Sequence, residues 1–204
     1  MADAPDWDAN SPEVAKNLGA VLIDAQRVMQ ARRPLDADMI RRWHIRAMQD
    51  LSVPDAAWVG AYRHELTRPP RDVVVGSLPG VLAIGLSDAL DDFFTRLGPA
   101  VAALDQQIQP SGPTTEDEVD AIVTLAAFAH AEWVRLHPFM NGNGRTARCI
   151  ANALAMRYGL PPFVRLRPRP DDGYGQAAGA AMLGDWQATI PVLRRALDRM
   201  LDET

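Results

Sequence analysis

Apolar residues recur every three or four positions along most of this 204-residue chain, which is the spacing of one buried face of an α-helix. The clearest stripe consists of Val119, Ile122, Val123, Ala126, Ala129, Trp133 and Leu136. The same spacing predicts helices over residues 11–31, 35–51, 87–97 and 145–158, and a last helix that begins near Pro191. The pattern therefore predicts an all-α, mostly helical protein.

Two of the predicted helices begin with residues that typically cap a helix N-terminus. Ser11 directly precedes Pro12, and proline is favoured at the first helical position because its fixed φ suits the helix. Thr115 and Glu118 have the spacing of a capping box, in which each side chain bonds to the backbone of the other residue. These residues place two helix starts independently of the apolar stripes.

Glycine and proline mark the predicted helix ends. Gly159 is followed closely by two prolines, which predicts that the preceding helix stops there. Ser87 is a candidate N-cap for a shorter helix that is predicted to run to about Leu97, because Gly98 and Pro99 follow directly.

A short β-hairpin is predicted in the first half of the chain. Two apolar runs flank the segment Gly-Ser-Leu-Pro-Gly at 76–80, and each run is rich in β-branched residues. Val73, Val74 and Val75 are predicted to form the first strand, and Val81–Ile84 the second.

The composition is that of one globular domain. Hydrophobic residues make up 48% of the chain, and a polar stretch at 1–10 is predicted to be a loose tail before a single domain over 11–204. The net charge of −5 disfavours nonspecific nucleic-acid binding, and no apolar run has the length of a membrane span. Cys149 is the only cysteine and the N-terminus does not resemble a signal peptide, so we expect a cytoplasmic protein with neither nucleic acid nor membrane as a partner.

Candidate chemistry concentrates in residues 137–148, which read His-Pro-Phe-Met-Asn-Gly-Asn-Gly-Arg-Thr-Ala-Arg. His137 is a candidate general base, because an imidazole accepts a proton near neutral pH. Gly142 and Gly144 let the backbone turn sharply and approach a ligand closely. The segment leads into a predicted helix, and the free N–H groups of a helix N-terminus attract anions.

Two arginines complete a candidate phosphate site. Arg145 and Arg148 lie at the start of the second helix, and a guanidinium group binds two phosphate oxygens at once. The alternative interpretations are structural: the glycines can form only a turn between helices, and Arg148 can pair with a carboxylate. His130, two helical turns before His137, is a poor candidate for a zinc site because the ligand spacing is wrong and a third ligand is missing.

Residues 137–148 resemble the signature of the Fic family, His-x-Phe-x-(Asp/Glu)-Gly-Asn-Gly-(Arg/Lys)-x-x-Arg, at every defined position but one. Residues 58–63, Trp-Val-Gly-Ala-Tyr-Arg, are similar to the Gly-x-Tyr-Arg segment that precedes the family's β-hairpin flap. Residues 172–185, which include Tyr174, resemble its C-terminal helix. The resemblance covers about residues 36–200 and implies the Fic fold, which is mostly helical with a short hairpin flap.

The resemblance implies a nucleotidyltransferase that moves AMP from ATP to a Ser, Thr or Tyr hydroxyl of a target protein, a reaction called AMPylation. His137 would deprotonate the attacking hydroxyl, and Phe139 would anchor the loop in the core. The flap strand Val73–Val75 would dock the target, largely through backbone pairing as an added strand.

The resemblance also assigns the phosphate contacts. The backbone of Gly142 to Gly144 and Asn143 would hold the phosphates. Arg145 would bind the β- and γ-phosphates, and Arg148 would support them. Phosphoryl transfer requires mainly positioning and charge stabilisation from a protein, and these residue types supply both.

Asn141 is the one departure from the signature. Family members usually have Asp or Glu there, and this carboxylate holds the Mg²⁺ that bridges the phosphates. Magnesium prefers anionic oxygen, so the neutral amide of Asn141 would be a weak ligand. Two alternatives to AMP transfer therefore stay open: a Fic-type transferase with another phosphate-containing donor or a small-molecule acceptor, and a degenerate Fic fold that binds nucleotide or a partner without catalysis.

A second difference concerns inhibition. Many relatives carry a helix with a (Ser/Thr)-x-x-x-Glu-(Gly/Asn) motif, whose glutamate pairs with the last arginine of the signature. No Ser or Thr of this chain is followed by Glu-Gly or Glu-Asn at that spacing. We therefore expect either a small antitoxin-like partner that supplies the glutamate or another means of control.

Overall fold

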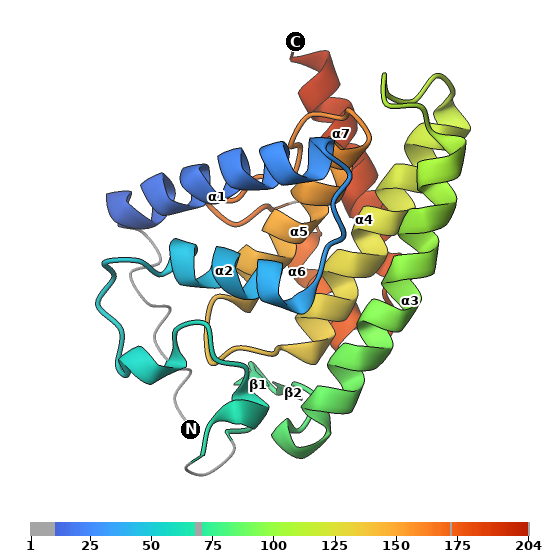
Figure 1. Ribbon diagram of the computed structural model, residues 1–204. Coiled ribbons are helices and arrows are strands. Elements are labelled where there is room, and N and C mark those ends of the chain that lie inside the picture. The colour runs from blue at the N-terminus through green and yellow to red at the C-terminus, as the bar shows by residue number, and fades with distance from the viewer. Residues whose placement is uncertain (1–10, 68–70, 172, 204) are drawn as a thin grey trace.

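The computed structural model describes residues 11–67, 71–171 and 173–203, and within them the chain forms a helical bundle with one short hairpin (Figure 1). The predicted tail over 1–10 lies outside the described residues. The helices are α1 (Pro12–Gln30), α2 (Ala37–Ala47), α3 (Leu86–Gln107), α4 (Glu116–Leu136), α5 (Asn143–Arg157), α6 (Tyr174–Met182) and α7 (Ile190–Asp202), and the strands are β1 (Val74–Val75) and β2 (Leu78–Pro79). The mostly helical fold with a hairpin is confirmed.

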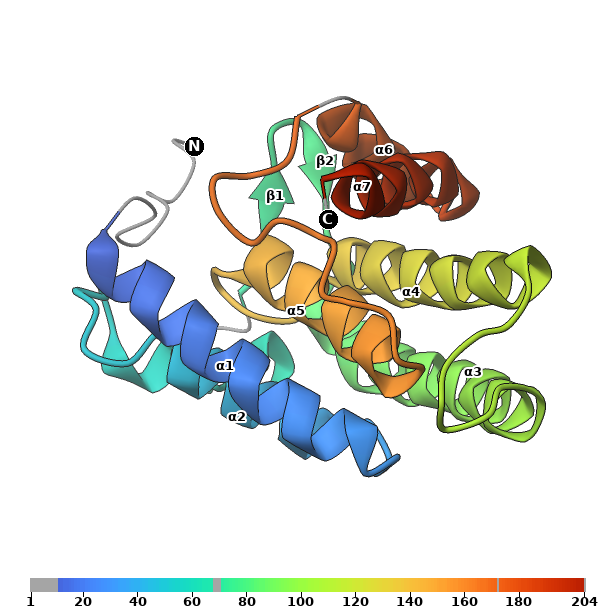
Figure 2. The same cartoon turned by 90° about the horizontal axis from the view of Figure 1, so that it is seen from above.

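Helix α5 is the centre of the bundle. It packs against α4 on one side and α1 on the other, with α2 beside α1 and α3 on the outer side of α4 (Figures 1 and 2). Helices α6 and α7 cover α4 from the other side of the molecule (Figure 2). Every side chain of α5 from Arg145 to Arg157 is buried, as expected of a helix that is enclosed all round.

The polar residues of this enclosed helix are satisfied by specific partners. Arg157 lies 2.6 Å from a carboxylate oxygen of Asp105 in α3 and donates to two backbone carbonyls after α1. Asn152 exchanges two 2.8 Å hydrogen bonds with the backbone of Val164. Burying such groups without partners is costly, so these bonds fix how the surrounding segments sit on α5.

The N-caps predicted at Ser11 and Thr115 are confirmed, and so is the helix stop at Gly159. The Ser11 hydroxyl accepts a hydrogen bond from the Val14 amide at 3.2 Å, and Thr115 with Glu118 forms the full capping box. Gly159 ends α5 in the left-handed region with a φ of +81°. That conformation strains residues with a Cβ and suits glycine, which explains the helix stop.

The helix predicted over residues 87–97 differs from the structure at both its start and its end. Helix α3 begins at Leu86 with Gly85 as its N-cap, so Ser87 is not the cap, and it continues through Pro99 to Gln107. Proline inside a helix costs about 3 kcal/mol. The apolar stripe continues past it, however, with Phe93, Leu97, Val101 and Leu104 all buried. The packing of this stripe outweighs the local cost of the proline.

The hairpin is tighter than predicted. Val74 pairs with Pro79 and Val75 with Leu78, so β2 lies within the segment that the sequence suggested as the turn. The turn needs only two residues because Gly76 adopts a φ of +61°. Val73 belongs to the same ladder, since its carbonyl accepts the Gly80 amide at 3.0 Å.

The predicted second strand at Val81–Ile84 is therefore wrong. Its residues lead instead into a 3₁₀ helix at Ala83–Gly85. The Ala83 amide donates to the Asp72 carboxylate at 2.7 Å, and the Val81 carbonyl accepts from Arg63. These side-chain contacts use the backbone groups that a strand would have paired with β1.

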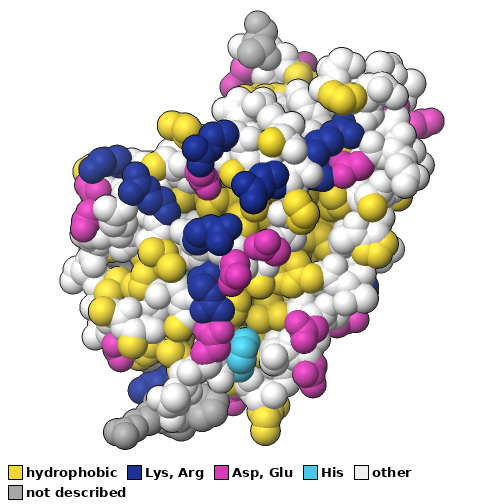
Figure 3. All heavy atoms as spheres, viewed as in Figure 1, with side chains coloured by type: hydrophobic (Ala, Val, Ile, Leu, Met, Phe, Trp, Pro, Cys, Tyr) yellow, Lys and Arg dark blue, Asp and Glu magenta, His cyan; other side chains and the backbone are white. Residues whose placement is uncertain are grey.

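The surface carries charges of both signs. On the face shown in Figure 3, basic and acidic side chains lie next to one another over an apolar background. Among the described residues, no helix is both long and apolar enough to cross a membrane.

The capping assignments give a first prediction. Thr115→Ala removes the acceptor for the Glu118 amide and should lower the free energy of unfolding by about 1 kcal/mol in urea titrations. Ser87→Ala is the matched control and should change the stability by less than about 0.5 kcal/mol, because Ser87 is exposed and does not cap α3. A larger loss for Ser87→Ala than for Thr115→Ala would contradict both assignments.

Candidate active site at the junction of α4 and α5

His137 lies at the C-cap of α4 in the left-handed conformation, with a φ of +49°. Its Nδ1 is 3.2 Å from the Val134 carbonyl oxygen, and a carbonyl only accepts hydrogen bonds. Nδ1 therefore carries the proton, and Nε2 carries the lone pair. Burial, with the nearby charge of Arg63, lowers the pKa of His137 from 6.5 to about 4, although the Val134 bond opposes the shift. At neutral pH the imidazole is a neutral base.

Arg63 connects this histidine to the hairpin. Its side chain is completely buried, and its backbone amide donates to the Pro138 carbonyl at 2.8 Å. The guanidinium group donates to the carbonyl oxygens of His137 (2.7 Å), Leu136 (3.3 Å), Arg71 (2.7 Å) and Val81 (2.5 Å). One side chain thus holds both the end of α4 and the two ends of the hairpin.

Phe139 and Asn143 shape the loop between α4 and α5. Phe139 is fully buried and stacks on His44 and Tyr62, with ring centroids 3.8 Å and 4.9 Å away. Asn143 exchanges two 2.8 Å hydrogen bonds with the backbone of Phe139. The Asn143 side chain is therefore directed into the loop, which it closes on itself.

His44 in α2 contacts the loop between α4 and α5 and supports it. Its Nδ1 accepts the Gly60 amide at 3.0 Å, so its Nε2 is the donor to the Asn141 carbonyl, also at 3.0 Å. Burial lowers the pKa of His44 to about 4, so the ring is neutral. Gly142 lies against this support with a φ of +77°, and a Cβ there would be 2.1 Å from the end of Met48. Only glycine fits this position.

Helix α5 begins directly after Gly142, and its first two turns carry the two arginines. Arg145 is 4% exposed and donates to the side-chain oxygen of Asn141 at 2.8 Å. The helix N-terminus adds its own partial positive charge at this point. A chain with a net charge of −5 thus gathers positive charge at one loop, which is the electrostatic requirement for a phosphate site.

Arg148 lies one turn further into α5 and is also buried. It donates to the Tyr174 hydroxyl at 3.2 Å and to the Leu166 carbonyl at 3.1 Å, and its contacts within the described residues include no carboxylate. The Tyr174 hydroxyl also lies 2.7 Å from Nε2 of His130, whose pKa burial lowers to about 3. His130 is therefore a core residue that joins α4 to α6.

The hairpin lies directly beside the base. Gly80 is buried at the end of β2, and a Cβ there would be 3.0 Å from Cβ of His137. Val74 and Val75 are exposed, with 54% and 44% of their surface accessible. Of the predicted flap residues, Val74 and Val75 thus face solvent near the predicted base, while Val73 is partly buried.

A magnesium ion fits these residues poorly. The signature loop offers the amide oxygen of Asn141 where a carboxylate is usual, and this oxygen already accepts a bond from Arg145. No group of three or more His, Cys, Asp or Glu that could hold a metal occurs among the described residues. Cys149 is buried, and burial raises the pKa of its thiol to about 12, so it is an inert core residue.

The structure gathers most predicted site residues at one place. His137, the two glycines, Arg145 and Arg148 all lie around the loop between α4 and α5. The sequence did not reveal that His44 supports this loop. Arg63 lies in a segment whose sequence resembles the family. The spacing of residues in that segment did not show that the Arg63 side chain reaches four carbonyl oxygens.

Comparison with known sequences identifies the family of this chain. The profile of the Fic/DOC family matches residues 34–155, which is more than half of the chain and includes the loop. The chain therefore belongs to the Fic/DOC family. A protein adenylyltransferase Fic from Nematostella vectensis is 40% identical over 81 residues, covering 39% of this chain and 18% of that protein. One from Aedes aegypti is 36% identical over 80 residues, so the chain matches less than a fifth of the length of these relatives.

Comparison with solved structures identifies the same fold. A Fic domain-containing signalling protein from Bacteroides thetaiotaomicron superposes with a TM-score of 0.66 at 22% identity, covering 93% of this chain and 70% of that one. The BepC effector of Bartonella tribocorum, solved with bound AMPPNP, superposes with a TM-score of 0.57 at 13% identity. That match covers 90% of this chain and 85% of BepC, and at these identities the likeness shows the fold alone.

The contacts of Arg63 give a second prediction. Arg63→Met should lower the free energy of unfolding by about 3 kcal/mol, because buried carbonyls lose their donors. Arg71→Met is the matched control: that side chain is exposed, and the loss should stay below about 1 kcal/mol. Urea unfolding of both variants measures the difference, and equal losses would show that Arg63 does not hold these segments together.

Proposed function

We propose that this chain is a Fic-type protein adenylyltransferase, which moves AMP from ATP to a Ser, Thr or Tyr hydroxyl of a target protein. The observation that carries the proposal is the state of His137: a neutral imidazole with its Nε2 lone pair available, beside a helix N-terminus with two buried arginines. A base next to a cluster of positive charge is what hydroxyl attack on a phosphate requires.

In the proposed reaction, Nε2 of His137 accepts the proton of the target hydroxyl as its oxygen attacks the α-phosphorus of ATP. The new oxygen–phosphorus bond forms, the bond from the α-phosphorus to the bridging oxygen breaks, and pyrophosphate leaves. Arg145 and the N–H groups at the start of α5 stabilise the negative charge on the phosphates. Asn143 contributes through the backbone, since its side chain is used inside the loop.

The hairpin supports target docking on one edge only. Val73 and Gly80 form a hydrogen-bonded pair, so the next pair, Val74 with Pro79, is non-bonded and directs its backbone groups outward. On β1 these are the N–H and C=O of Val74, which an extended segment of the target can pair with. On β2 the outward position is Pro79, which has no N–H to donate. We therefore place the target strand along β1.

Asn141 supports a second candidate for the donor. A transferase that depends little on a tightly held metal, with another phosphate-containing donor, is compatible with an amide at this position. A site that binds nucleotide without transfer is the remaining alternative, and the intact base argues against it. For control of the activity, we propose a separate small protein that offers a glutamate to Arg148, whose Nε is buried and lacks a partner among the described residues.

The role of the base gives the third prediction. His137→Ala should reduce transfer of labelled AMP by about a hundred- to ten-thousand-fold, because a general base typically contributes that much. Affinity for ATP, measured by calorimetry, should change little, because the imidazole acts on the acceptor. A variant that transfers at the wild-type rate would refute this mechanism, and wild-type protein that binds nucleotide without labelling any acceptor would favour a binding module.

The lowered pKa of His137 sets the pH dependence of the wild-type rate. Because the group is already neutral well below its ordinary pKa of 6.5, transfer should stay level from pH 8 to about pH 5 and fall only towards pH 4. The same shift destabilises the fold in acid, since below pH 6.5 the unfolded chain binds protons that the folded chain does not. Circular dichroism at each pH separates loss of the base from loss of the fold.

Asn141 gives the fourth prediction. Asn141→Asp keeps the size of the side chain and supplies an anionic ligand, so Mn²⁺ binding, followed by electron paramagnetic resonance in the presence of a non-hydrolysable ATP analogue, should tighten about tenfold. Transfer should also quicken at low Mg²⁺. Asn143→Asp is the matched control and should not tighten metal binding, because that side chain is directed into the loop. Overlapping metal titrations of wild type and Asn141→Asp would show that position 141 does not govern the metal.

A further inference from the structure

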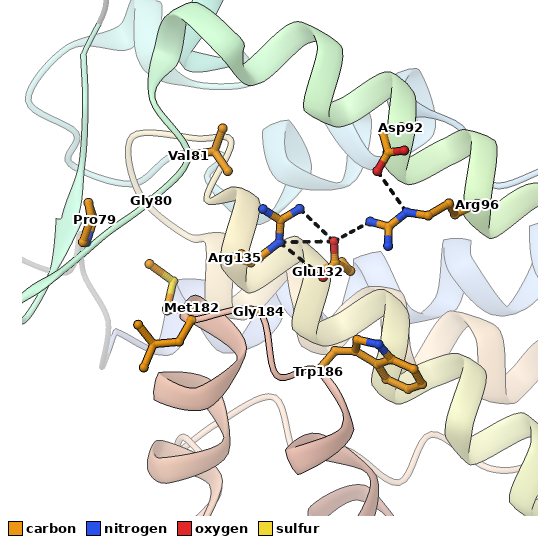
Figure 4. A pocket seen from close by; sticks show the side chains of 11 residues that line it. Pro79, Gly80, Val81, Asp92, Arg96, Glu132, Arg135, Met182, Gly184 and Trp186 are labelled. Carbon is orange, nitrogen blue, oxygen red and sulfur yellow. Dashed lines mark hydrogen bonds and ion pairs between the residues drawn. The ribbon is translucent and has the colours of Figure 1, made fainter.

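A cavity of about 770 Å³ lies on the β2 side of the hairpin (Figure 4). The end of β2, the middle of α3, the last turns of α4 and the segment after α6 enclose it. No step of the proposed transfer uses its residues. Its floor consists of charged side chains, which is uncommon for a simple packing defect.

Glu132 is the centre of this floor and is shared by two arginines. Its side chain is 4% exposed, and it accepts from Arg96 at 2.6 Å and from Arg135 at 2.9 Å (Figure 4). Burial alone raises the pKa of Glu132, but the bonds and charges of Arg135 and Arg96 outweigh it, so the pKa is lowered. The carboxylate is ionised and acts as a fixed brace for both guanidinium groups.

The arginines keep donors for a ligand. Arg96 uses Nη2 on Glu132 and Nε on Asp92, and Arg135 uses Nε and Nη2 on Glu132. Within the described part of the chain, neither Nη1 has a hydrogen-bond partner. Both arginines are partly accessible, with 42% and 28% of their side chains exposed. Each therefore holds a preorganised N–H donor at the wall of the cavity.

The floor offers hydrogen-bond donors to an anion. The two guanidinium groups meet two carboxylates, the buried one of Glu132 and that of Asp92, which is 61% exposed and 2.9 Å from Nε of Arg96, so the formal charges cancel and the attraction comes from the two Nη1 donors. The walls are apolar: Val81, Met182 and Trp186 line the cavity, and Leu183 does so while 76% exposed. An apolar collar over a floor with two guanidinium N–H donors suits a carboxylate on a short aliphatic stem.

The cavity adjoins the base. Gly80 lines it and also packs against His137, and Arg135 precedes His137 by only two residues. Glu132 and His137 are separated by about 8 Å along the axis of α4, at 1.5 Å per residue.

We propose that the cavity is a docking subsite for an acidic side chain, Asp or Glu, of the protein that receives the transferred group. The subsite selects the target, while the β1 edge aligns its backbone. This inference rests on the proposed function for its biological role, but the binding of a carboxylate side chain is a property of the cavity itself and can be measured without transfer.

The test follows the Nε–H resonances of Arg96 and Arg135 in the full chain labelled with ¹⁵N-arginine. The probe is N-acetylglutamate amide, which has one side-chain carboxylate, and its neutral isostere N-acetylglutamine amide is the control. The glutamate probe should shift both resonances with saturation, and the glutamine probe should bind about tenfold more weakly. Equal responses to the two probes would overturn the proposal.

Three variants locate the site. Arg96→Lys keeps a cation beside Glu132 but loses the free Nη1, so it should weaken glutamate binding about fivefold or more. Arg42→Lys is the matched control, since Arg42 is exposed and does not line this cavity, and it should have no effect. Asp92→Asn removes a rim charge and should bind the probe at least as tightly as wild type. Unchanged affinity in Arg96→Lys would place the probe elsewhere.

Two further measurements distinguish a failure of the subsite proposal from a failure of the proposed function. Inorganic phosphate that binds more tightly than the glutamate probe would identify a general anion site and overturn the side-chain assignment. With an acceptor protein in hand, Arg96→Lys should raise KM for that protein about fivefold or more while kcat stays unchanged. Probe binding without any transfer would refute the proposed function alone, and transfer with no effect of Arg96→Lys on KM would refute the subsite alone.

Discussion

The buried guanidinium group of Arg63 is the interaction on which the site depends. The guanidinium group donates hydrogen bonds to carbonyl oxygens at the end of α4 and at both ends of the hairpin, in place of water. The Arg63 side chain is itself completely buried. A buried charge of this kind is stable only when its donors are matched, so the geometry of the three segments is fixed together. Arg63 therefore fixes the position of His137 relative to the hairpin. A movement of the hairpin would be transmitted to His137 through this side chain.

The donor side of the site has a separate support. The loop between α4 and α5 is closed by Asn143, stacked on the core through Phe139 and supported by the neutral ring of His44. None of these contacts involves the hairpin. The phosphate loop thus has supports of its own in addition to the contacts of Arg63 that it shares with the hairpin.

The sequence predicted what is determined locally. Helices with continuous apolar stripes and standard caps were found, and the loop at 137–148 was identified because its function requires an uncommon combination of residues. It did not predict features that depend on distant partners. The packing of the apolar stripe beyond Pro99 outweighs the local cost of the proline, so α3 continues past it. Asp72 and Arg63 form hydrogen bonds with the backbone of the segment that was predicted as the second strand. The role of His44 depends on a segment almost a hundred positions away.

The bond between Arg145 and Asn141 has a consequence for how an anion reaches Arg145. With an aspartate at position 141, Arg145 would rest in an ion pair, and incoming phosphates would have to compete with a full negative charge for the guanidinium group. The hydrogen bond from the same arginine to the neutral amide is weaker than an ion pair, so an anion competes with it more easily. Position 141 therefore sets how readily the site exchanges an internal partner for a ligand, quite apart from any effect on a cation.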